Sequence, residues 1–253
     1  MKPPFVELPL VHCRNGRGHR VTRPVVRETF LELRLNDEPL VEIACAGIHV
    51  EELALGYLKS EGLIDGIDDV AGITVEESPP RVSLTTTDTR EAPSPTVSIM
   101  SSGAGKRTEH VAAFHTDSGP ALSPVQICSL MDRLLEATTI HTITRGTHCS
   151  GLAMKGELLC TREDIGRHNT VDMIVGYTLK ERIHCGQAAL LTTGRISAEI
   201  VGKALSQGFP VIISHSVPTS GAVDSARRSG MTLVGYVRNS EFRVYTHESR
   251  VIV

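Results

Sequence analysis

Helix and strand patterns alternate through the second half of the sequence, and this order limits the fold more than any other feature. The series opens at Ser123, which can cap a helix, and at Pro124, which suits the first turn of that helix. Helices that alternate with strands require a sheet covered by helices on both faces. We therefore expect an α/β domain over residues 118–253. Apolar periodicity places its strands at residues 150–155, 157–161, 187–193, 210–214, 231–237 and 242–246, and its helices at residues 168–181, 197–207 and 220–229.

The first part of the chain predicts a smaller unit. Apolar and polar residues alternate on both sides of Asn36-Asp37, which is typical of a β-hairpin. Residues 50–58 carry apolar side chains at helical spacing. We expect a β-rich α+β domain over residues 21–86, with strands at residues 29–35, 39–44, 70–75 and 81–86.

Two segments lie outside these units. Residues 1–20 are polar, and we expect a flexible tail there. Residues 87–117 are rich in Ser, Thr, Pro and Gly and poor in large apolar side chains. A connection this long is usually functional or mobile, so we place the domain boundary in this loop.

Composition excludes several classes of protein. Hydrophobic residues make up 40% of the 253 residues, so the chain can bury a core, and with no Trp that core must be aliphatic. A formal net charge of -3 argues against general nucleic-acid binding, although a local basic pocket stays open. No apolar run approaches the ~20 residues of a membrane helix, and no signal peptide is recognisable. The six cysteines form no C-x-x-C pair. We expect a cytoplasmic protein with reduced thiols.

A charge-rich stretch at residues 162–169 is the first candidate for a binding site. It follows a strand-like segment and precedes a helical one, so we expect it at a strand-to-helix junction. Backbone N–H groups at such junctions, with the positive end of the helix, can bind an anion. Arg167 and His168 are its candidate binding residues.

Polar residues also gather at other predicted strand ends, in residues 144–150, 192–197 and 214–220. Strand ends of an open α/β sheet meet in one crevice where ligands bind. Each segment also has an ordinary structural explanation: a solvated salt-bridge group, a satisfied histidine or a plain turn. Their recurrence favours a shared site. Its candidate residues are Arg145, His148, Arg167, His168, Gly194 and Arg195.

Arginine guanidinium groups suit phosphate or carboxylate, so a phosphorylated, ring-bearing ligand such as a nucleotide fits this set. No metal site is predicted. A zinc deaminase needs H-x-E or C-x-E followed by P-C-x-x-C, whereas His148 is followed by Cys149 and Ser150 and no P-C-x-x-C occurs.

Several long motifs resemble the FdhD/NarQ family of formate dehydrogenase accessory proteins, in order and from about residue 21 onward. The motifs are EELALGYLKSEGLI (51–64), RGTHCSGL (145–152), REDIGRHNTVD (162–172), TTGRISAEIVGKALSQGFPVIIS (192–214), SVPTSGAV (216–223) and GMTLVGYVR (230–238).

The resemblance implies a cytidine-deaminase-like fold for the second domain, with a mixed sheet and flanking helices but without the zinc site, and a homodimer. Family members accept sulfur from a cysteine desulfurase. They pass it to the molybdenum of the bis(molybdopterin guanine dinucleotide) cofactor, which is delivered to the formate dehydrogenase catalytic subunit. A guanine nucleotide such as GDP would mimic part of that cofactor. Matched by motif, the cofactor-binding segment is Tyr236, Val237, Arg238, Asn239, Ser240 and Glu241.

One departure from the family pattern affects the expected chemistry. The family has C-G-x-C-G between its domains, and a cysteine there carries a persulfide. Here Ser102 and Gly105 match the two cysteine positions, and a serine hydroxyl cannot form a persulfide. Cys149 is the substitute candidate, unless it is a buried, inert thiol.

Three alternatives to sulfur transfer therefore stay open. The first is a cofactor chaperone without sulfur transfer. The second is a nucleotide or nucleobase hydrolase on the deaminase fold. The third is an interaction module for the desulfurase or the dehydrogenase that binds no cofactor.

Overall fold

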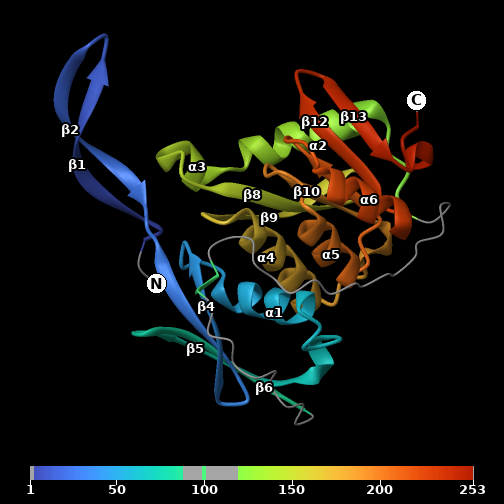
Figure 1. Ribbon diagram of the computed structural model, residues 1–253, viewed down its shortest axis with the longest axis horizontal. Coiled ribbons are helices and arrows are strands. Elements are labelled where there is room, and N and C mark those ends of the chain that lie inside the picture. The colour runs from blue at the N-terminus through green and yellow to red at the C-terminus, as the bar shows by residue number, and fades with distance from the viewer. Residues whose placement is uncertain (1–2, 88–98, 101–118, 253) are drawn as a thin grey trace.

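The structure is a computed structural model that describes residues 3–87, 99–100 and 119–252 (Figure 1). It contains a protruding hairpin, a β-rich N-terminal unit and a C-terminal unit built on a mixed sheet. The elements in chain order are β1 (Phe5–Arg14), β2 (Arg17–Val26), β3 (Thr29–Leu35), β4 (Glu38–Cys45), α1 (Val50–Ser60), β5 (Val70–Glu77), β6 (Pro80–Thr86), β7 (Ile99–Met100), α2 (Pro124–Glu136), α3 (Thr139–Thr144), β8 (His148–Met154), β9 (Glu157–Asp164), α4 (Arg167–Lys180), β10 (Ala188–Thr192), α5 (Ala198–Ser206), β11 (Val211–Ser214), α6 (Ser220–Ser229), β12 (Thr232–Arg238) and β13 (Glu241–Thr246).

The C-terminal sheet has the strand order β13-β12-β11-β10-β8-β9. Strands β10, β11 and β12 run parallel, whereas β8, β9 and β13 are antiparallel to their neighbours. Alternate side chains of the buried strands enter two cores. Leu190 and Ile212 pack with α4 and α5, and Leu191 and Ile213 pack with α2 on the other face. The expected α/β class with a mixed, helix-flanked sheet is confirmed.

The N-terminal unit is a sheet of order β5-β6-β3-β4-β7 with α1 packed on it. Leu31, Leu33 and Leu35 alternate with less buried residues along β3, so one face of this sheet is apolar. Helix α1 lies between this sheet and α4 (Figure 1). One continuous core therefore spans both units, because α1 is covered on two sides.

Two glycines let α1 and α4 approach closely. A Cβ on Gly56 of α1 would lie 1.8 Å from the carbonyl oxygen of Asp172, and one on Gly176 of α4 would lie 1.9 Å from that of Glu52. No side chain fits at either distance, so the backbones of the two helices touch directly. This contact anchors the N-terminal unit to the helix that begins at the sheet edge.

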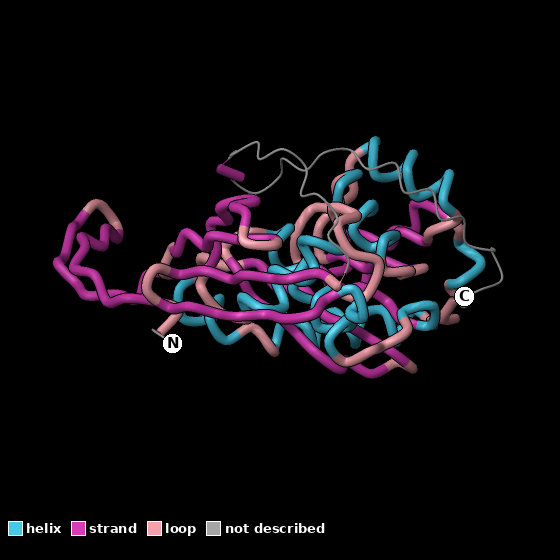
Figure 2. Tube along the Cα trace, turned by 90° about the horizontal axis from the view of Figure 1, so that it is seen from below, coloured by secondary structure: helices cyan, strands magenta, loops and turns pink. Residues whose placement is uncertain are grey.

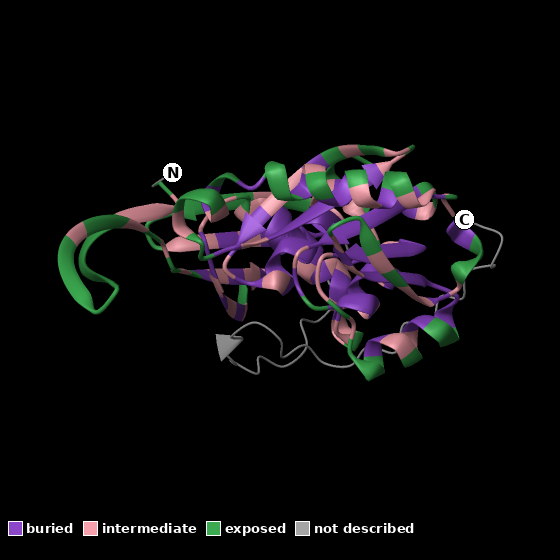
Figure 3. Ribbon diagram, turned by 90° about the horizontal axis from the view of Figure 1, so that it is seen from above, coloured by how far each residue is buried: buried purple, intermediate pink, exposed green. Residues whose placement is uncertain are grey.

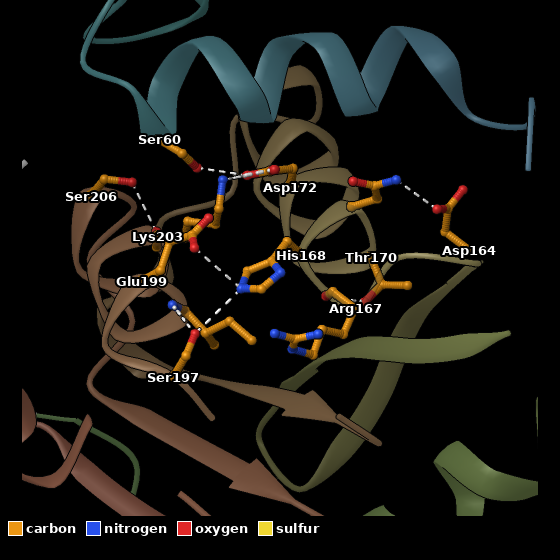
Figure 4. A network of polar contacts seen from close by, with 12 residues as sticks. Ser60, Asp164, Arg167, His168, Thr170, Asp172, Ser197, Glu199, Lys203 and Ser206 are labelled. Carbon is orange, nitrogen blue, oxygen red and sulfur yellow. Dashed lines mark hydrogen bonds and ion pairs between the residues drawn. The ribbon is translucent and has the colours of Figure 1, made fainter. Parts of the chain in front are cut away.

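Polar contacts reinforce the same junction. The guanidinium of Arg162 in β9 donates to both carboxylate oxygens of Glu52 in α1 and lies over the ring of Tyr177, 5.0 Å from its centroid. Asp172 of α4 accepts from Lys203 of α5 and from the hydroxyl of Ser60 at the end of α1 (Figure 4).

The first residues differ from the expected flexible tail over residues 1–20. Residues 5–26 form the antiparallel hairpin β1–β2, which extends away from the rest of the molecule (Figure 2). Its turn is Asn15-Gly16, with φ of 52° and 74°, the left-handed conformation that a tight hairpin turn requires. The Asn-Gly pair is itself a hairpin signal that the sequence prediction overlooked.

Elsewhere the predicted elements are largely confirmed, with shifted boundaries. Asn36 and Asp37 form the β3–β4 turn, and the Ser123 hydroxyl accepts from the backbone N–H of Gln126 to cap α2. Helix α3 was not predicted. Strand β9 continues to Asp164, so the charged stretch begins inside a strand rather than after it. Most of the connecting loop at residues 87–117 lies outside the described residues.

Candidate functional site

One edge of the C-terminal sheet brings the predicted polar segments together. The parallel strands β10, β11 and β12 end there, β8 begins there and β9 ends there, as the pairing of Thr192 with both Ser150 and Ser214 shows. Backbone hydrogen bonds join the loops beyond the strands: His215 N–H donates to the Thr192 carbonyl at 3.1 Å, and Tyr236 N–H donates to the Ser216 carbonyl at 2.6 Å. The predicted polar segments therefore lie together at one edge of the sheet.

Gly194 sits where two of these segments touch. A Cβ added to it would lie 2.8 Å from the Cβ of Arg167 at the start of α4. The Gly194 carbonyl accepts from the Ser214 hydroxyl at 2.7 Å, and its N–H donates to the Thr192 hydroxyl at 3.1 Å. A larger residue would push the loop after β10 away from Arg167, so Gly194 sets the spacing between the two.

His168 is a buried, neutral histidine in this edge (Figure 4). Its Nε2 lies 3.3 Å from the Ser197 hydroxyl and 3.4 Å from a Glu199 carboxylate oxygen. Burial, with the charges of Arg167 and Lys203 nearby, lowers the pKa of His168 to about 3. A carboxylate only accepts, so Glu199 favours the tautomer with the proton on Nε2, which leaves Nδ1 as an acceptor. Sequence reasoning missed Glu199, although it lies within one of the quoted motifs.

Positive charge surrounds His148 at the start of β8. Burial lowers the pKa of His148, and the charges of Arg167, His141 and Arg195 lower it further. These residues come from separate segments of the chain. Because all three lower the pKa of one imidazole, the fold must bring them close to it. Arg195 and Arg145 are exposed, and Arg145 ends α3 in the left-handed conformation with a φ of 56°. The edge is therefore electropositive.

A stack of cations on an aromatic ring lies at the end of β12. The guanidinium carbons of Arg238 and Arg243 lie 4.4 Å and 4.3 Å from the ring centroid of Tyr236. Arg238 also donates to the His215 carbonyl at 3.0 Å. Arg243, on β13, was not among the predicted site residues.

The other residues of the segment predicted to bind the cofactor lie partly at the surface and partly in the core. Asn239 and Ser240 form the exposed β12–β13 turn with φ of 51° and 60°, and Glu241 is exposed beside it. Val237 points into the core beneath α2 and is 2% exposed, so its side chain is not part of a binding surface.

Three buried polar atoms at this edge have no hydrogen-bond partner. They are Arg167 Nε, His168 Nδ1 and Arg238 Nε, and within the described ranges of the chain no other buried side-chain nitrogen or oxygen atom lacks one. An unsatisfied buried polar group costs ~1–3 kcal/mol, so such groups point to a missing ligand or solvent partner. All three belong to residues that the sequence predicted for the site.

The acidic residues of the charged stretch serve the fold instead. The Glu163 carboxylate accepts from the backbone N–H groups of Thr139, Ile140 and His141 at 2.6–2.9 Å and so caps α3. Both Glu163 carboxylate oxygens are therefore occupied by donors of the protein itself.

Asp164 is used in the same way. Its carboxylate accepts from Ala46 N–H at 2.7 Å, Gly166 N–H at 2.9 Å and the Asn169 amide at 2.7 Å. Burial nevertheless raises the pKa of Asp164 to about 6. Together Asp164 and Asn169 join the end of β4 to the start of α4.

Cys149 does not suit sulfur transfer. It is 1% exposed within the core beneath α2, and burial, with Glu163 nearby, raises the pKa of its thiol to about 12. A persulfide carrier needs an accessible thiolate. The other candidate position, Ser102, lies outside the described residues.

Of the six cysteines, all of which the structure describes, only Cys13 on the hairpin is exposed. Cys45, Cys160 and Cys185 are buried, with thiol pKa values raised to about 12, 11 and 11 by burial.

Two features are absent from the described residues. No group of three or more His, Cys, Asp or Glu side chains is arranged to bind a metal ion there. No described helix combines the length and apolar character that crossing a bilayer demands.

Fold and site together define an α/β protein whose mixed sheet presents an electropositive edge suited to an anionic ligand. Comparison with known proteins narrows this class. The sequence profile of the FdhD/NarQ family matches residues 26–252, so the chain belongs to that family.

Individual relatives support the assignment. The chain is 33% identical to the sulfur carrier protein FdhD of Geobacillus kaustophilus (strain HTA426), covering 97% of this chain and 96% of that protein. It is 32% identical to the sulfur carrier protein FdhD of Staphylococcus aureus (strain JH9), and the match covers 96% of this chain and 95% of that protein. A crystal structure of a candidate formate dehydrogenase accessory protein from Desulfotalea psychrophila superposes with a TM-score of 0.85 at 28% identity, over 99% of this chain and 100% of that one.

Proposed function

We propose that this protein is an accessory factor for a formate dehydrogenase, and that it binds the bis(molybdopterin guanine dinucleotide) molybdenum cofactor at the electropositive sheet edge. The cofactor is cargo for the dehydrogenase catalytic subunit. The observation that carries the proposal is the set of unpartnered buried atoms on Arg167, His168 and Arg238, which the fold leaves without partners at one edge.

The chemistry of the edge fits a guanine nucleotide. Arg167 and Arg195 supply charge for a diphosphate, and guanidinium groups match phosphate geometry. The neutral His168 offers an acceptor, which suits the N–H donors of guanine better than a cation would. Tyr236 and its stacked arginines offer flat surfaces on which a base or sugar can pack.

Calorimetric titration of the full chain with GDP tests this proposal. Wild-type protein should bind GDP, and Arg238→Ala should weaken binding ~10–100-fold, because a hydrogen bond to a charged group contributes ~1.5–3 kcal/mol. Arg195→Ala should act in the same direction, although less because Arg195 is exposed. Arg228→Ala, in the last turn of α6, removes the same charge away from the edge and should bind as wild type. The proposal fails if wild-type protein shows no GDP binding.

Sulfur transfer is a separable part of the proposal. In the family reaction, a persulfide on a cysteine desulfurase passes its outer sulfur to a thiolate of the carrier. The burial of Cys149 disfavours that residue here, and Cys13 is the exposed thiol. The test is to incubate the protein with a cysteine desulfurase and cysteine and then to measure its mass. If the chain carries sulfur, Cys13 should gain one sulfur atom, about 32 Da. A chain that stays unmodified but still binds GDP would be a cofactor chaperone.

A further inference from the structure

The two ring nitrogens of His168 have different surroundings (Figure 4). Nε2 faces α5, where it lies 3.3 Å from the Ser197 hydroxyl and 3.4 Å from a Glu199 carboxylate oxygen. Nδ1 is buried and has no hydrogen-bond partner among the described residues. Because burial lowers the pKa of His168 to about 3, the imidazole is neutral and only one nitrogen carries a proton. The position of that proton decides whether Nδ1 accepts or donates a hydrogen bond.

Packing holds this imidazole in place. Helix α4, which carries His168, belongs to the buried interior that Figure 3 shows in purple, and most of its residues are buried. Helix α5 packs against α4, and Ile200 and Val201 near its start are fully buried. The Ser197 hydroxyl caps α5 by accepting from the N–H of Ile200 at 3.4 Å. The ring and the residues that face Nε2 are therefore positioned by two packed helices.

Ser197 alone does not determine the tautomer of His168. A hydroxyl group both accepts and donates, so Ser197 can accept from a protonated Nε2 or donate to an unprotonated one. Its hydrogen bond with Ile200 uses the oxygen as an acceptor, and the hydroxyl proton stays available. With Ser197 as its partner, the ring could therefore adopt either tautomer.

Glu199 removes this freedom. A carboxylate has no proton to donate, so an unprotonated Nε2 would place two acceptors 3.4 Å apart. Burial raises the pKa of Glu199, whereas the charges of Lys203 and Arg167 oppose this by favouring the carboxylate. The carboxylate therefore selects the tautomer with the proton on Nε2 and leaves the lone pair of Nδ1 to accept from another group.

The charge of Glu199 also has a purely structural explanation. An acidic residue in the first turn of a helix interacts favourably with the positive end of that helix. In that role Glu199 would affect the stability of α5, but neither the tautomer of His168 nor the recognition of a ligand. The two explanations therefore differ in what the loss of the carboxylate changes.

We propose that Glu199 is a positioning residue that makes the electropositive sheet edge selective for a base with N–H donors, such as guanine. It acts through His168, whose Nδ1 accepts from one of those donors, and it needs no contact of its own with the ligand. Adenine is disfavoured because it has an acceptor at the ring position where guanine carries an N–H. This role rests on the proposed function and adds to it the residue that decides which base is recognised.

The tautomer of His168 can be measured without any ligand. Nitrogen NMR of the full chain, isotopically labelled in its histidine rings, distinguishes a protonated from an unprotonated Nδ1, and the spectrum of His168→Gln assigns the signal. Wild-type protein should have an unprotonated Nδ1. In Glu199→Gln the side-chain amide can donate to Nε2, which moves the ring proton to Nδ1. Glu199→Asp keeps a group that only accepts and should keep the wild-type tautomer.

Calorimetric titration with GDP, ADP and pyrophosphate tests the effect on recognition. Wild-type protein should prefer GDP to ADP, and Glu199→Gln should weaken GDP binding ~10–100-fold, because a protonated Nδ1 then faces a donor of the base. Pyrophosphate has no base, and the loss of a negative charge beside the basic edge should leave its binding equal or tighter. A general disruption of the site cannot give this pair of results. Glu136→Gln, at the end of α2 on the other face of the sheet, is the matched control and should bind all three ligands as wild type does.

Two results would overturn this role of Glu199: a wild-type tautomer retained in Glu199→Gln, or equal losses of GDP and pyrophosphate affinity in that variant. Wild-type protein that binds no GDP would refute the proposed function and the base selectivity together. An unchanged tautomer in a chain that does bind GDP refutes the role of Glu199 alone, so the two failures are distinguishable.

Discussion

Replacing Lys203 with Met should destabilise this protein more than almost any other single loss of charge. The Lys203 ammonium lies 2.9 Å and 2.8 Å from the two carboxylate oxygens of Asp172, and the two residues are 5% and 3% exposed. Ser60 supplies the other hydrogen bond to this carboxylate, at 2.8 Å. The variant keeps the volume of the side chain but leaves Asp172 with one neutral donor.

The loss of stability expected for Lys203→Met follows from the desolvation of Asp172. Removing one partner of a buried ion pair costs ~3–5 kcal/mol, because the remaining charge is buried without compensation. Burial already raises the pKa of Asp172, and Lys203 is the main influence that lowers it. Without Lys203 the folded-state pKa rises further above the unfolded value. The penalty should therefore be present at neutral pH and should shrink as pH falls toward the unfolded value of ~4, below which both states are protonated.

Urea unfolding followed by circular dichroism measures this cost. Adding Asp172→Asn to Lys203→Met should recover part of the loss, since the uncompensated charge is gone, with a coupling energy of ~2–3 kcal/mol. Lys180→Met is the matched control: its pair with Glu51 has the same 2.8 Å distance but is 44% and 37% exposed, so it should cost under ~1 kcal/mol. Equal losses for Lys203→Met and Lys180→Met would refute the reasoning.

Two further predictions concern the junction between the units. The folded pKa of Asp164, about 6, lies above its unfolded value, so its contribution to stability is present below pH ~4 and is lost as pH rises through 6. Asp164→Asn should therefore flatten the unfolding free energy between pH 4 and pH 6 by up to ~3 kcal/mol, and an unchanged slope would contradict this. Gly176→Ala should lower the melting temperature because its Cβ would lie 1.9 Å from a carbonyl oxygen. A Cβ added to Gly202 on α5 would have no atom within 4 Å, so Gly202→Ala should stabilise the protein by up to ~1 kcal/mol. Equal effects of the two substitutions would show that the contact between α1 and α4 is not tight.

Local patterns were enough to predict most elements and the strand ends at which polar residues gather. Apolar periodicity located the helices and strands of the C-terminal unit, and the order of those elements placed Arg167, Gly194 and Arg238 at strand ends. The topology then required these ends to meet, because parallel strands joined through helices end at the same edge. These features depend on neighbours in sequence, which is why they are visible in it.

Tertiary structure alone decided what each polar residue does. Glu163, Asp164 and Arg162 resemble ligand-binding groups in the sequence, yet each is occupied by a partner that lies at least 22 residues away. Likewise, no local pattern reveals that Gly56 and Gly176 touch opposing backbones, or that Arg238 Nε is buried without a partner. The chain thus determines by itself where polar groups gather. Whether such a group is used by the fold or left for a ligand depends on distant segments packing against it, since only burial makes an unpaired polar atom costly.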